Sequence, residues 1–331
     1  MGKSDAVTRT YMRENAVFAD AVNYLIYNGK PVIKPENLRE MDTEEVAVLS
    51  EKAGKKKNVK TVMKYRDLLK LAVLMEDMEA TYLIVGIEEQ TKIHYAMPVR
   101  NMIYDALEYG KQVSDTAAIH KQEKVTGDFE YQPNDGEYLS GFHKSDKLKP
   151  IITIVIHFGA EEWDAPMSLH EMLETQNSEL LKYVQDYKIH LIDPVRISEG
   201  DLEKFKSSLG TVMGYIKYSK DKEQFARYKE KNQGKLLENK AAQVVKVITG
   251  IPMEIDEEEE EQDMCKAFEE MLEDSRNEGK AAGRLEGLQE GRNEGKLGIL
   301  SQLIEQGLLT LETAAAQVNM TPEEFQKAIT K

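Results

Sequence analysis

Two short segments of the chain are apolar at nearly every position. Residues 82–90 read Tyr-Leu-Ile-Val-Gly-Ile-Glu-Glu-Gln, and residues 151–158 read Ile-Ile-Thr-Ile-Val-Ile-His-Phe. A strand that is covered on both sides of a sheet has this character, because both of its faces are buried. We therefore predict two interior strands at these positions.

Apolar residues at a spacing of three and four flank the first predicted strand. Residues 14–28 carry this pattern before it, and residues 99–113 carry it afterwards, with Pro98 near the start. The spacing predicts amphipathic helices, and the order strand, helix, strand is typical of an α/β core. The run at residues 68–74 fits a strand or a helix, and residues 30–60 look irregular or partly helical.

The second half of the chain has a mostly helical pattern. Helical spacing extends from Pro166 to about residue 187, and a short apolar segment at residues 189–192 predicts a strand. Ser198, followed three residues later by Asp201, resembles the Ser/Thr-x-x-Glu signal that begins a helix. From there to residue 250 we expect helices.

Glycines recur every four residues in the tail, at Gly279, Gly283, Gly287, Gly291 and Gly295. On a helix they form one stripe without side chains, and each costs about 1 kcal/mol relative to Ala. The stripe favours close approach of a partner helix, with a flexible charged linker as the alternative. Thr321, Pro322 and Glu324 then begin the second of two short helices. Because acids dominate that helix, we expect packing or oligomer contact there rather than DNA recognition.

Composition is that of an ordinary globular protein. With 331 residues and 41% hydrophobic content, the chain has room for one large domain or two smaller ones. Its single cysteine, Cys265, provides neither a disulfide framework nor a cysteine metal site. Because we find no signal-peptide core and no run of about 20 apolar residues, we expect a soluble cytoplasmic protein without a membrane partner.

The net charge of −15 is unevenly distributed. Residues 254–294 hold 16 acids and 5 basic residues. Residues 52–70, in contrast, hold eight basic residues and only one acid, Asp67. Lys and Arg drive phosphate binding by replacing counterions. A solvated loop is the alternative for the basic run. We expect four of its lysines to contact DNA: Lys55, Lys56, Lys57 and Lys60.

Acidic residues end the first predicted strand. Residues i and i+2 of a strand face the same way, so Glu88 and Gln90 point together while Glu89 points to the other side. With Asp67 upstream, two carboxylates at a strand edge can hold Mg²⁺ beside substrate oxygens. The pattern favours metal-dependent phosphodiester cleavage, and a structural role for Glu88 at a strand end is the alternative.

Other signatures of chemistry are missing from the sequence. The six histidines show no His-Glu-x-x-His spacing, so a zinc hydrolase is not predicted. No Gly-x-x-x-x-Gly-Lys phosphate loop is found, so an ATP-driven motor is not predicted either. Trp163 is expected to seal a turn onto the core.

Several motifs around the predicted acidic site resemble one known family. Asp67, residues 86–90 and residues 95–104 (Tyr-Ala-Met-Pro-Val-Arg-Asn-Met-Ile-Tyr) together look like the PD-(D/E)xK nuclease family putative transposases, the group that includes the Rpn recombination-promoting nucleases. Residues 150–166 and the Glu- and Gly-rich tail are similar to the same family. The resemblance covers residues 15–193 and the tail.

The resemblance implies a restriction-endonuclease-like α/β core with a central mixed sheet. It implies Asp67 and Glu88 as metal-binding acids, with the backbone carbonyl of Glu89 as a further ligand of Mg²⁺ or Mn²⁺. Gln90 stands where the family name has Lys, and an amide orients water or phosphate but carries no positive charge. Arg100 is expected to supply that charge as a catalytic residue, with Lys70 and Lys92 as alternatives. A surface or structural ion pair is the alternative role for Arg100. Tyr104 is expected to serve packing.

The sequence thus predicts three regions with different roles. Residues 1–195 form the nuclease-like domain, residues 196–252 a helical extension, and residues 253–331 an acidic helical tail through which the chain forms a homo-oligomer. The expected function is metal-dependent DNA endonuclease activity linked to recombination or mobile elements. The alternative is a weak or inactive nuclease fold that acts as a DNA-binding or protein-interaction module.

Overall fold

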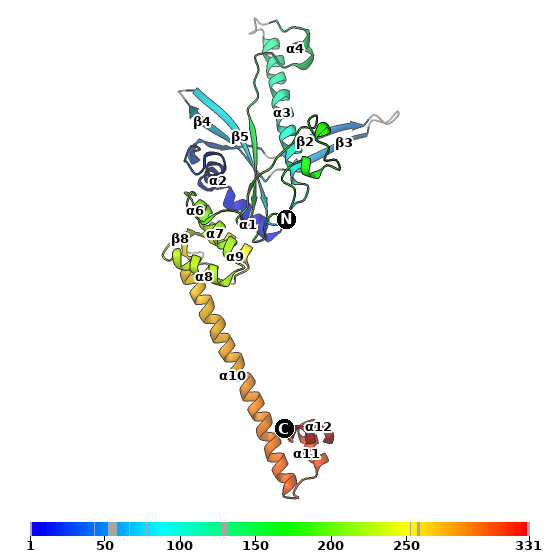
Figure 1. Cartoon of the computed structure of the whole chain (residues 1–331), viewed down its shortest axis with the longest axis vertical. Helices are drawn as coiled ribbons and strands as arrows, with labels where there is room; N and C mark the ends of the chain where they lie inside the picture. The colour runs from blue at the N-terminus through cyan, green and yellow to red at the C-terminus, as the bar shows by residue number, and fades with distance from the viewer. Residues whose placement is uncertain are drawn as a thin grey trace. The chain divides into compact units, whose positions relative to one another are not determined.

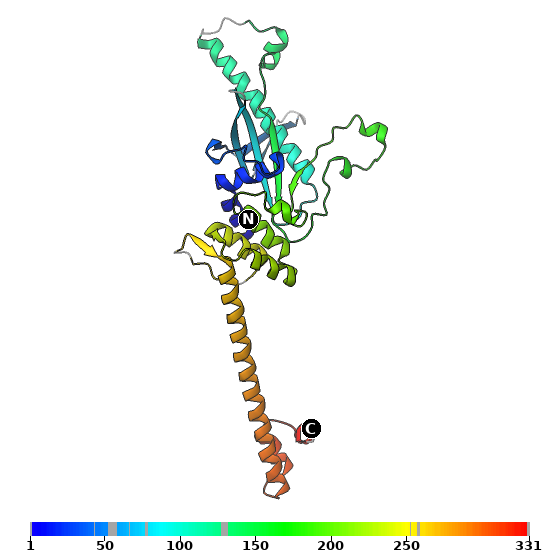
Figure 2. The same cartoon turned by 60° about the vertical axis from the view of Figure 1, so that its left-hand side comes forward.

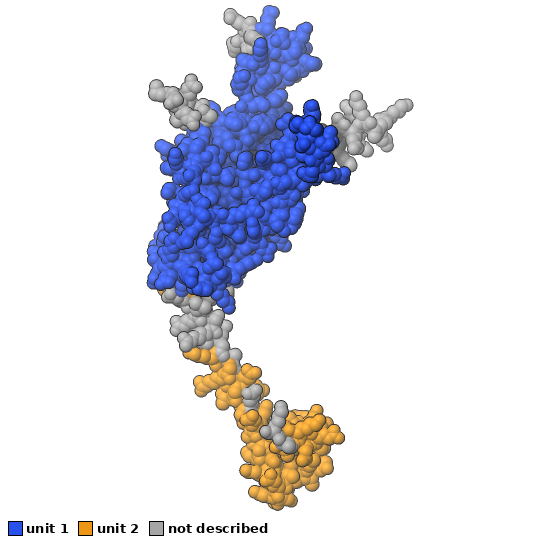
Figure 3. All heavy atoms as spheres, in the orientation of Figure 1, with its two compact units in different colours: residues 1–265 blue, residues 266–331 orange. Residues whose placement is uncertain are grey.

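The computed structural model contains two compact units, residues 1–265 and residues 266–331 (Figure 3). The structure describes residues 2–42, 44–51, 58–65, 67–76, 79–126, 132–251, 253–256 and 259–329.

A five-stranded mixed sheet forms the centre of the first unit (Figure 1). Its strands, in spatial order, are β1 (Leu38–Glu40), β4 (Leu68–Glu76), β5 (Glu79–Gln90), β6 (Ile151–His157) and β7 (His190–Ile192). β5 pairs antiparallel with β4 and parallel with β6. The predicted α/β class, the mixed sheet and the two interior strands are therefore confirmed.

Helices cover both faces of this sheet. On one face lie α1 (Lys3–Met12) and α2 (Asn15–Tyr27), and on the other lies α3 (Met97–Thr126), as Figures 1 and 2 show. Leu69 and Ile84 pack with Tyr109 on the α3 side. Trp163 is fully buried with Met97 from α3, so its predicted sealing role is confirmed.

Residues 30–60 were expected to be irregular or partly helical, but most of the described residues of this range are in strands. After the short 3-10 helix η1 (Pro35–Asn37) and β1, strands β2 (Glu44–Glu51) and β3 (Asn58–Tyr65) form an antiparallel hairpin. The ambiguous run at residues 68–74 is also a strand, because it pairs along its length with β5.

The helix predicted from Pro166 to residue 187 was wrong. This segment holds only the 3-10 helix η2 (His170–Met172) and one turn of helix, α5 (Ser178–Leu181). An isolated antiparallel β-bridge between Ser168 and Lys188 brings the two ends of the segment together. None of the apolar side chains of the segment is fully buried, and Tyr183 is 88% exposed, so the segment lacks the buried face that stabilises a longer helix.

A helical region completes the first unit. It comprises α6 (Glu199–Leu202), α7 (Leu209–Tyr218), α8 (Lys222–Lys231) and α9 (Asn239–Thr249), and β8 (Leu236–Glu238) pairs with β9 (Glu261–Asp263). As predicted, Ser198 caps α6 by accepting a hydrogen bond from the Asp201 amide at 3.1 Å. The Asp20 carboxylate of α2 accepts amide hydrogen bonds from Lys206 and Ser207, which ties this region to the sheet domain.

The tail is helical, including the glycine stripe. α10 (Met264–Glu305) is followed by α11 (Leu311–Gln317) and α12 (Pro322–Ile329), and buried Phe325 packs with Ala314 and Ala315. Thr321 and Glu324 cap α12 as predicted. Among the described residues, no helix has the length and apolar character to cross a bilayer.

Candidate functional site

Adjacent strand ends bring the predicted acids together. Leu68 pairs with Ile87 in antiparallel register, so the next position on each strand places Asp67 opposite Glu88. Asp67 Oδ2 accepts a hydrogen bond from the Glu89 amide at 3.1 Å. The β4–β5 pairing therefore fixes the Asp67 carboxylate at the end of β5.

Glu88 is fully buried and faces α3. Its Oε2 lies 3.0 Å from Nη2 of Arg100, and Arg100 Nε donates to the Tyr104 hydroxyl at 3.2 Å. Burial alone would lower the pKa of Arg100, but the negative charges of Glu88 and Asp67 and the Tyr104 contact raise it above its usual value. Arg100 therefore stays charged beside Glu88, and Tyr104 positions it as well as packing against the core.

Glu89 is oriented differently from Glu88. Its side chain is buried and lies in the field of Thr8 and Arg9 of α1. Burial raises the pKa of Glu89 well above its usual value, repulsion from Asp67 and Glu88 adds to the rise, and Arg9 opposes it. The Glu89 side chain thus lies on the α1 side of β5, whereas Glu88 faces α3. This agrees with the expectation that successive side chains of β5 face opposite ways.

Arg9 is a site residue that the sequence reasoning missed. Its guanidinium forms an ion pair with Oδ1 of Asp67. Asp5, on the same helix, accepts a hydrogen bond from Thr91 at 2.9 Å, so α1 is fastened across the end of β5. No local pattern joins Arg9 to Asp67, because the contact spans 58 positions and depends on where α1 packs.

Gln90 is held by its backbone at the end of the sheet. Its carbonyl accepts a hydrogen bond from the Phe158 amide at 2.8 Å and lies 3.1 Å from His157 Nδ1. Its side chain is buried and, two residues after Glu88, belongs to the same face of β5. Gln90 thus has a fixed backbone position and a buried side chain on the face of β5 that carries Glu88.

The lysines proposed as sources of positive charge lie elsewhere. Lys70 points to the α2 side, where its Nζ donates to the Arg13 carbonyl and to Asn15 Oδ1 at 2.6 Å each. Lys92 is exposed, and Lys60 lies within β3. Three further lysines, Lys55, Lys56 and Lys57, fall outside the described residues. Of the three side chains that we predicted as sources of positive charge, Arg100 is the one that contacts the Glu88 carboxylate.

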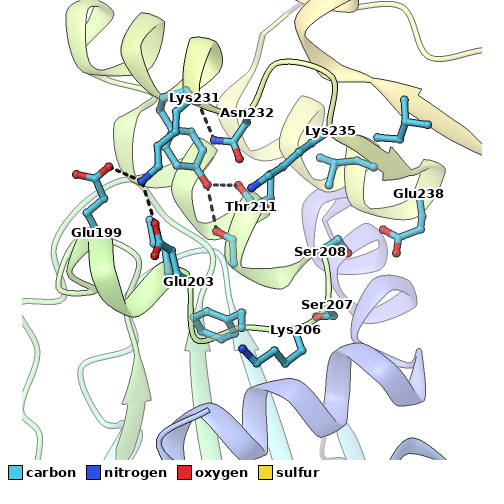
Figure 4. Close-up of a pocket in the computed structure, with 16 residues that line it drawn as sticks. Glu199, Glu203, Lys206, Ser207, Ser208, Thr211, Lys231, Asn232, Lys235 and Glu238 are labelled. Carbon is cyan, nitrogen blue, oxygen red and sulfur yellow. Dashed lines mark hydrogen bonds and ion pairs between the residues drawn. The ribbon is translucent and has the colours of Figure 1, made fainter. Parts of the chain in front are cut away.

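A separate cavity of 460 Å³ lies in the helical region (Figure 4). Lys231 crosses its rim and pairs with Glu199 at 2.8 Å and Glu203 at 3.1 Å. Tyr228 donates to the Thr211 carbonyl at 3.5 Å. None of the residues that line this cavity belongs to the acidic site, so it adds nothing to that chemistry.

The fold and the site define an α/β protein whose mixed sheet presents two carboxylates at neighbouring strand ends, with an arginine from α3 beside one of them. A family model described as "Putative transposase, YhgA-like" matches residues 137–245, which include β6, β7 and helices α6 to α8. The resemblance predicted from the sequence is confirmed where it overlaps this match, at residues 137–193. The match covers less than half of the chain and does not include Asp67, Glu88, Gln90 or Arg100. No curated protein and no solved structure matches the chain.

Proposed function

We propose that this protein is a metal-dependent DNA endonuclease that hydrolyses phosphodiester bonds in connection with recombination or mobile elements. The observation that carries the proposal is the placement of Asp67 beside Glu88, with Arg100 3.0 Å from the Glu88 carboxylate. The description of the matching family model, a transposase, supports the link to mobile elements.

The donor atoms suit a hard divalent cation. Asp67 and Glu88 would hold Mg²⁺ or Mn²⁺ through carboxylate oxygens, and the backbone carbonyl of Glu89 would add a third oxygen. Because Glu88 is fully buried, its negative charge needs a compensating cation; Arg100 provides it for Glu88, and Arg9 provides one for Asp67. When bound, the metal would polarise a phosphoryl oxygen and lower the pKa of a bound water.

The remaining side chains have distinct roles in this proposal. Arg100 stabilises negative charge that develops on the phosphate, since its guanidinium remains protonated beside Glu88. Gln90 orients a water or a phosphate oxygen through its amide. Arg9 neutralises Asp67 through an ion pair, which Asp67 would give up in order to hold a metal.

DNA and a second copy of the chain are the proposed partners. The basic lysines that precede Asp67 would contact the phosphate backbone. The glycine stripe of α10 would pack against another helix, because an added Cβ at Gly283, Gly287, Gly291 or Gly295 meets no atom within 4 Å in one chain. A single molar mass equal to one chain in light scattering would argue against this oligomer.

A second candidate function is a nuclease fold with little or no activity that binds DNA or protein. Gln90 favours this candidate, since it stands where the family pattern has Lys. Lys70, a possible substitute, donates on the other face of the sheet to the Arg13 carbonyl, which lies between α1 and α2, and to Asn15 at the start of α2. The two functions share the fold and differ in whether Arg100 alone supplies enough charge for catalysis.

Plasmid nicking separates the two candidates. Purified protein is incubated with supercoiled DNA in Mg²⁺ or in EDTA, alongside Asp67→Asn and Glu88→Gln, which keep side-chain volume. Glu179→Gln, an exposed acid on α5, is the control. We expect nicking that requires Mg²⁺ and falls about a hundredfold or more in both site variants. Activity that persists in EDTA or in both variants would refute the assignment, and DNA binding without nicking would favour the second candidate.

A further inference from the structure

A second cluster of potential metal ligands lies away from the acidic site. His120 from α3 meets His143 and Asp146, which follow α4 (Asp135–Ser140), near the end of α3 farthest from Arg100 (Figure 1). One ligand atom from each of the three residues lies within 4.8 Å of the other two. Among the His, Cys, Asp and Glu residues that the structure describes, this is the group with that geometry.

Direct contacts hold the three side chains together. His120 Nε2 lies 2.8 Å from Asp146 Oδ2, and the same oxygen accepts the His143 amide hydrogen bond at 2.6 Å. The His120 and His143 rings stack with centroids 3.7 Å apart and planes 19° from parallel. The cluster is sheltered from solvent, since His143 is only 7% exposed.

An outer carboxylate orients His120 in the way that metal-binding histidines need. Glu123, one turn along α3, places Oε2 3.5 Å from His120 Nδ1. A histidine that gives one ring nitrogen to a carboxylate presents the other to a metal in a fixed direction. Here that second nitrogen is Nε2, which faces Asp146.

The loop that carries His143 and Asp146 is fixed against α3. Glu137 caps α4 and also accepts the Lys144 amide hydrogen bond at 2.9 Å. Gly141 has a φ of +70°, and a Cβ added there would lie 2.7 Å from the Ala117 Cβ on α3. Such close approach keeps the two ligands of the loop near His120.

We propose that His120, His143 and Asp146 bind one Zn²⁺ ion that fastens the segment after α4 to α3. Two imidazoles and one carboxylate match the nitrogen and oxygen ligands of Zn²⁺, which bind at about 2.0–2.2 Å, whereas Mg²⁺ prefers oxygen ligands. The ion takes the place of the proton between His120 Nε2 and Asp146 Oδ2, and that proton leaves to solvent. The stacked rings tilt toward the ion, and a 510 Å³ cavity beside them gives room for this tilt and for a water as the fourth ligand.

Zinc titration of the full-length protein tests this site. The Glu88→Gln protein removes one acid of the other site, and it serves as the parent after dialysis against EDTA and then against metal-free buffer. Calorimetry with ZnCl₂ and visible absorption with Co²⁺ are compared for the parent, His120→Ala, His143→Ala and Asp146→Asn. His190→Ala, an exposed histidine on β7, is the matched control.

We expect one Zn²⁺ per chain in the parent and in His190→Ala. Each of the three cluster variants should lose at least about tenfold in affinity and the Co²⁺ absorption of a low-symmetry nitrogen and oxygen site. Zn²⁺ should also raise the melting temperature of the parent but not of His143→Ala. Circular dichroism identifies any misfolded variant. If the histidine variants are misfolded, the Zn²⁺ affinity of Asp146→Asn, the most conservative of the three changes, decides the result. A parent that binds no Zn²⁺, or cluster variants that bind it as the parent does, would overturn the proposal.

Discussion

Arg100 Nη2 lies 3.0 Å from Oε2 of Glu88, and the two side chains differ sharply in exposure. The arginine side chain is 27% exposed, whereas the glutamate side chain is 0% exposed. Removing one partner of a buried ion pair is costly, because the other charge is left in a medium of low dielectric constant. Glu88 therefore depends on Arg100 more than Arg100 depends on Glu88.

The first prediction concerns this pair. Arg100→Met should lower the free energy of unfolding by about 3–5 kcal/mol, since it leaves the Glu88 carboxylate buried without its guanidinium. The double variant Glu88→Gln with Arg100→Met should recover most of that loss. Urea denaturation measures both, and Arg227→Met, in an exposed ion pair with Glu223, is the control. Equal stability of the single and double variants would show that the pair is not coupled.

The second prediction concerns the ion pair between Arg9 and Asp67. If Asp67 must leave Arg9 to bind a metal, Arg9→Gln should raise the affinity for Mn²⁺, about fivefold or more for a coupling near 1 kcal/mol. Electron paramagnetic resonance of free Mn²⁺ measures this affinity. Arg13→Gln, in an exposed pair with Glu40, should leave it unchanged. Lower affinity in Arg9→Gln would mean instead that Arg9 supports the metal site.

The third prediction concerns the contact between α7 and α8. A Cβ added at Gly214 would lie 2.1 Å from the Tyr228 hydroxyl oxygen, so Gly214→Ala should destabilise the protein by about 1–3 kcal/mol. Gly200, also helical, has no atom within 4 Å of such a Cβ. Gly200→Ala should therefore be neutral or slightly stabilising, because Ala favours helix. Thermal denaturation measures the melting temperatures of the two variants. Equal melting temperatures would contradict the close packing at Gly214.

The fourth prediction concerns pH. Burial raises the pKa of Tyr228 from 10.0 to about 12, so the unfolded chain loses this proton before the folded protein does. The contribution of Tyr228 to the free energy of unfolding is therefore fully present below pH 10. It falls by about 2–3 kcal/mol in all as the pH rises toward 12. Tyr228→Phe should therefore show a shallower fall in urea midpoint between pH 9 and pH 11. Parallel curves for the two proteins would exclude a shifted tyrosine.

Strands that are buried on both faces could be predicted from the sequence, whereas the separate pair of strands β2 and β3 and the segment at residues 166–187 could not. β5 and β6 are continuous apolar runs, and burial on both sides explains them. The strands β2 and β3 show neither a continuous apolar run nor strict alternation, as in residues 58–65 (Asn-Val-Lys-Thr-Val-Met-Lys-Tyr), and their mutual pairing decides their conformation. Residues 166–187 show the opposite failure, because apolar spacing there meets no surface on which a helix could pack.

The acidic site could be predicted in part for the same reason. Glu88 and Gln90 belong to one strand end, and the period of a strand alone sets their directions. The ion pair of Arg9 with Asp67 joins segments that are 58 positions apart, and His120 lies 26 positions from Asp146. Such partners have no shared spacing, so only the packing of α1 and of the segment after α4 reveals them.

The mixed pairing of β5 also sets an order of events during folding. β4 and β5 form a hairpin of neighbouring segments, whereas the parallel partner β6 arrives only after α3 and the following loop close across 67 positions between Ile84 and Ile151. Local contacts form before distant ones, because loop closure costs entropy. The hairpin therefore brings Asp67 and Glu88 together before α3 docks Arg100. During folding we therefore expect a stage in which the Asp67 and Glu88 carboxylates face each other without Arg100. Their repulsion should be weaker at high salt concentration, because dissolved ions screen it.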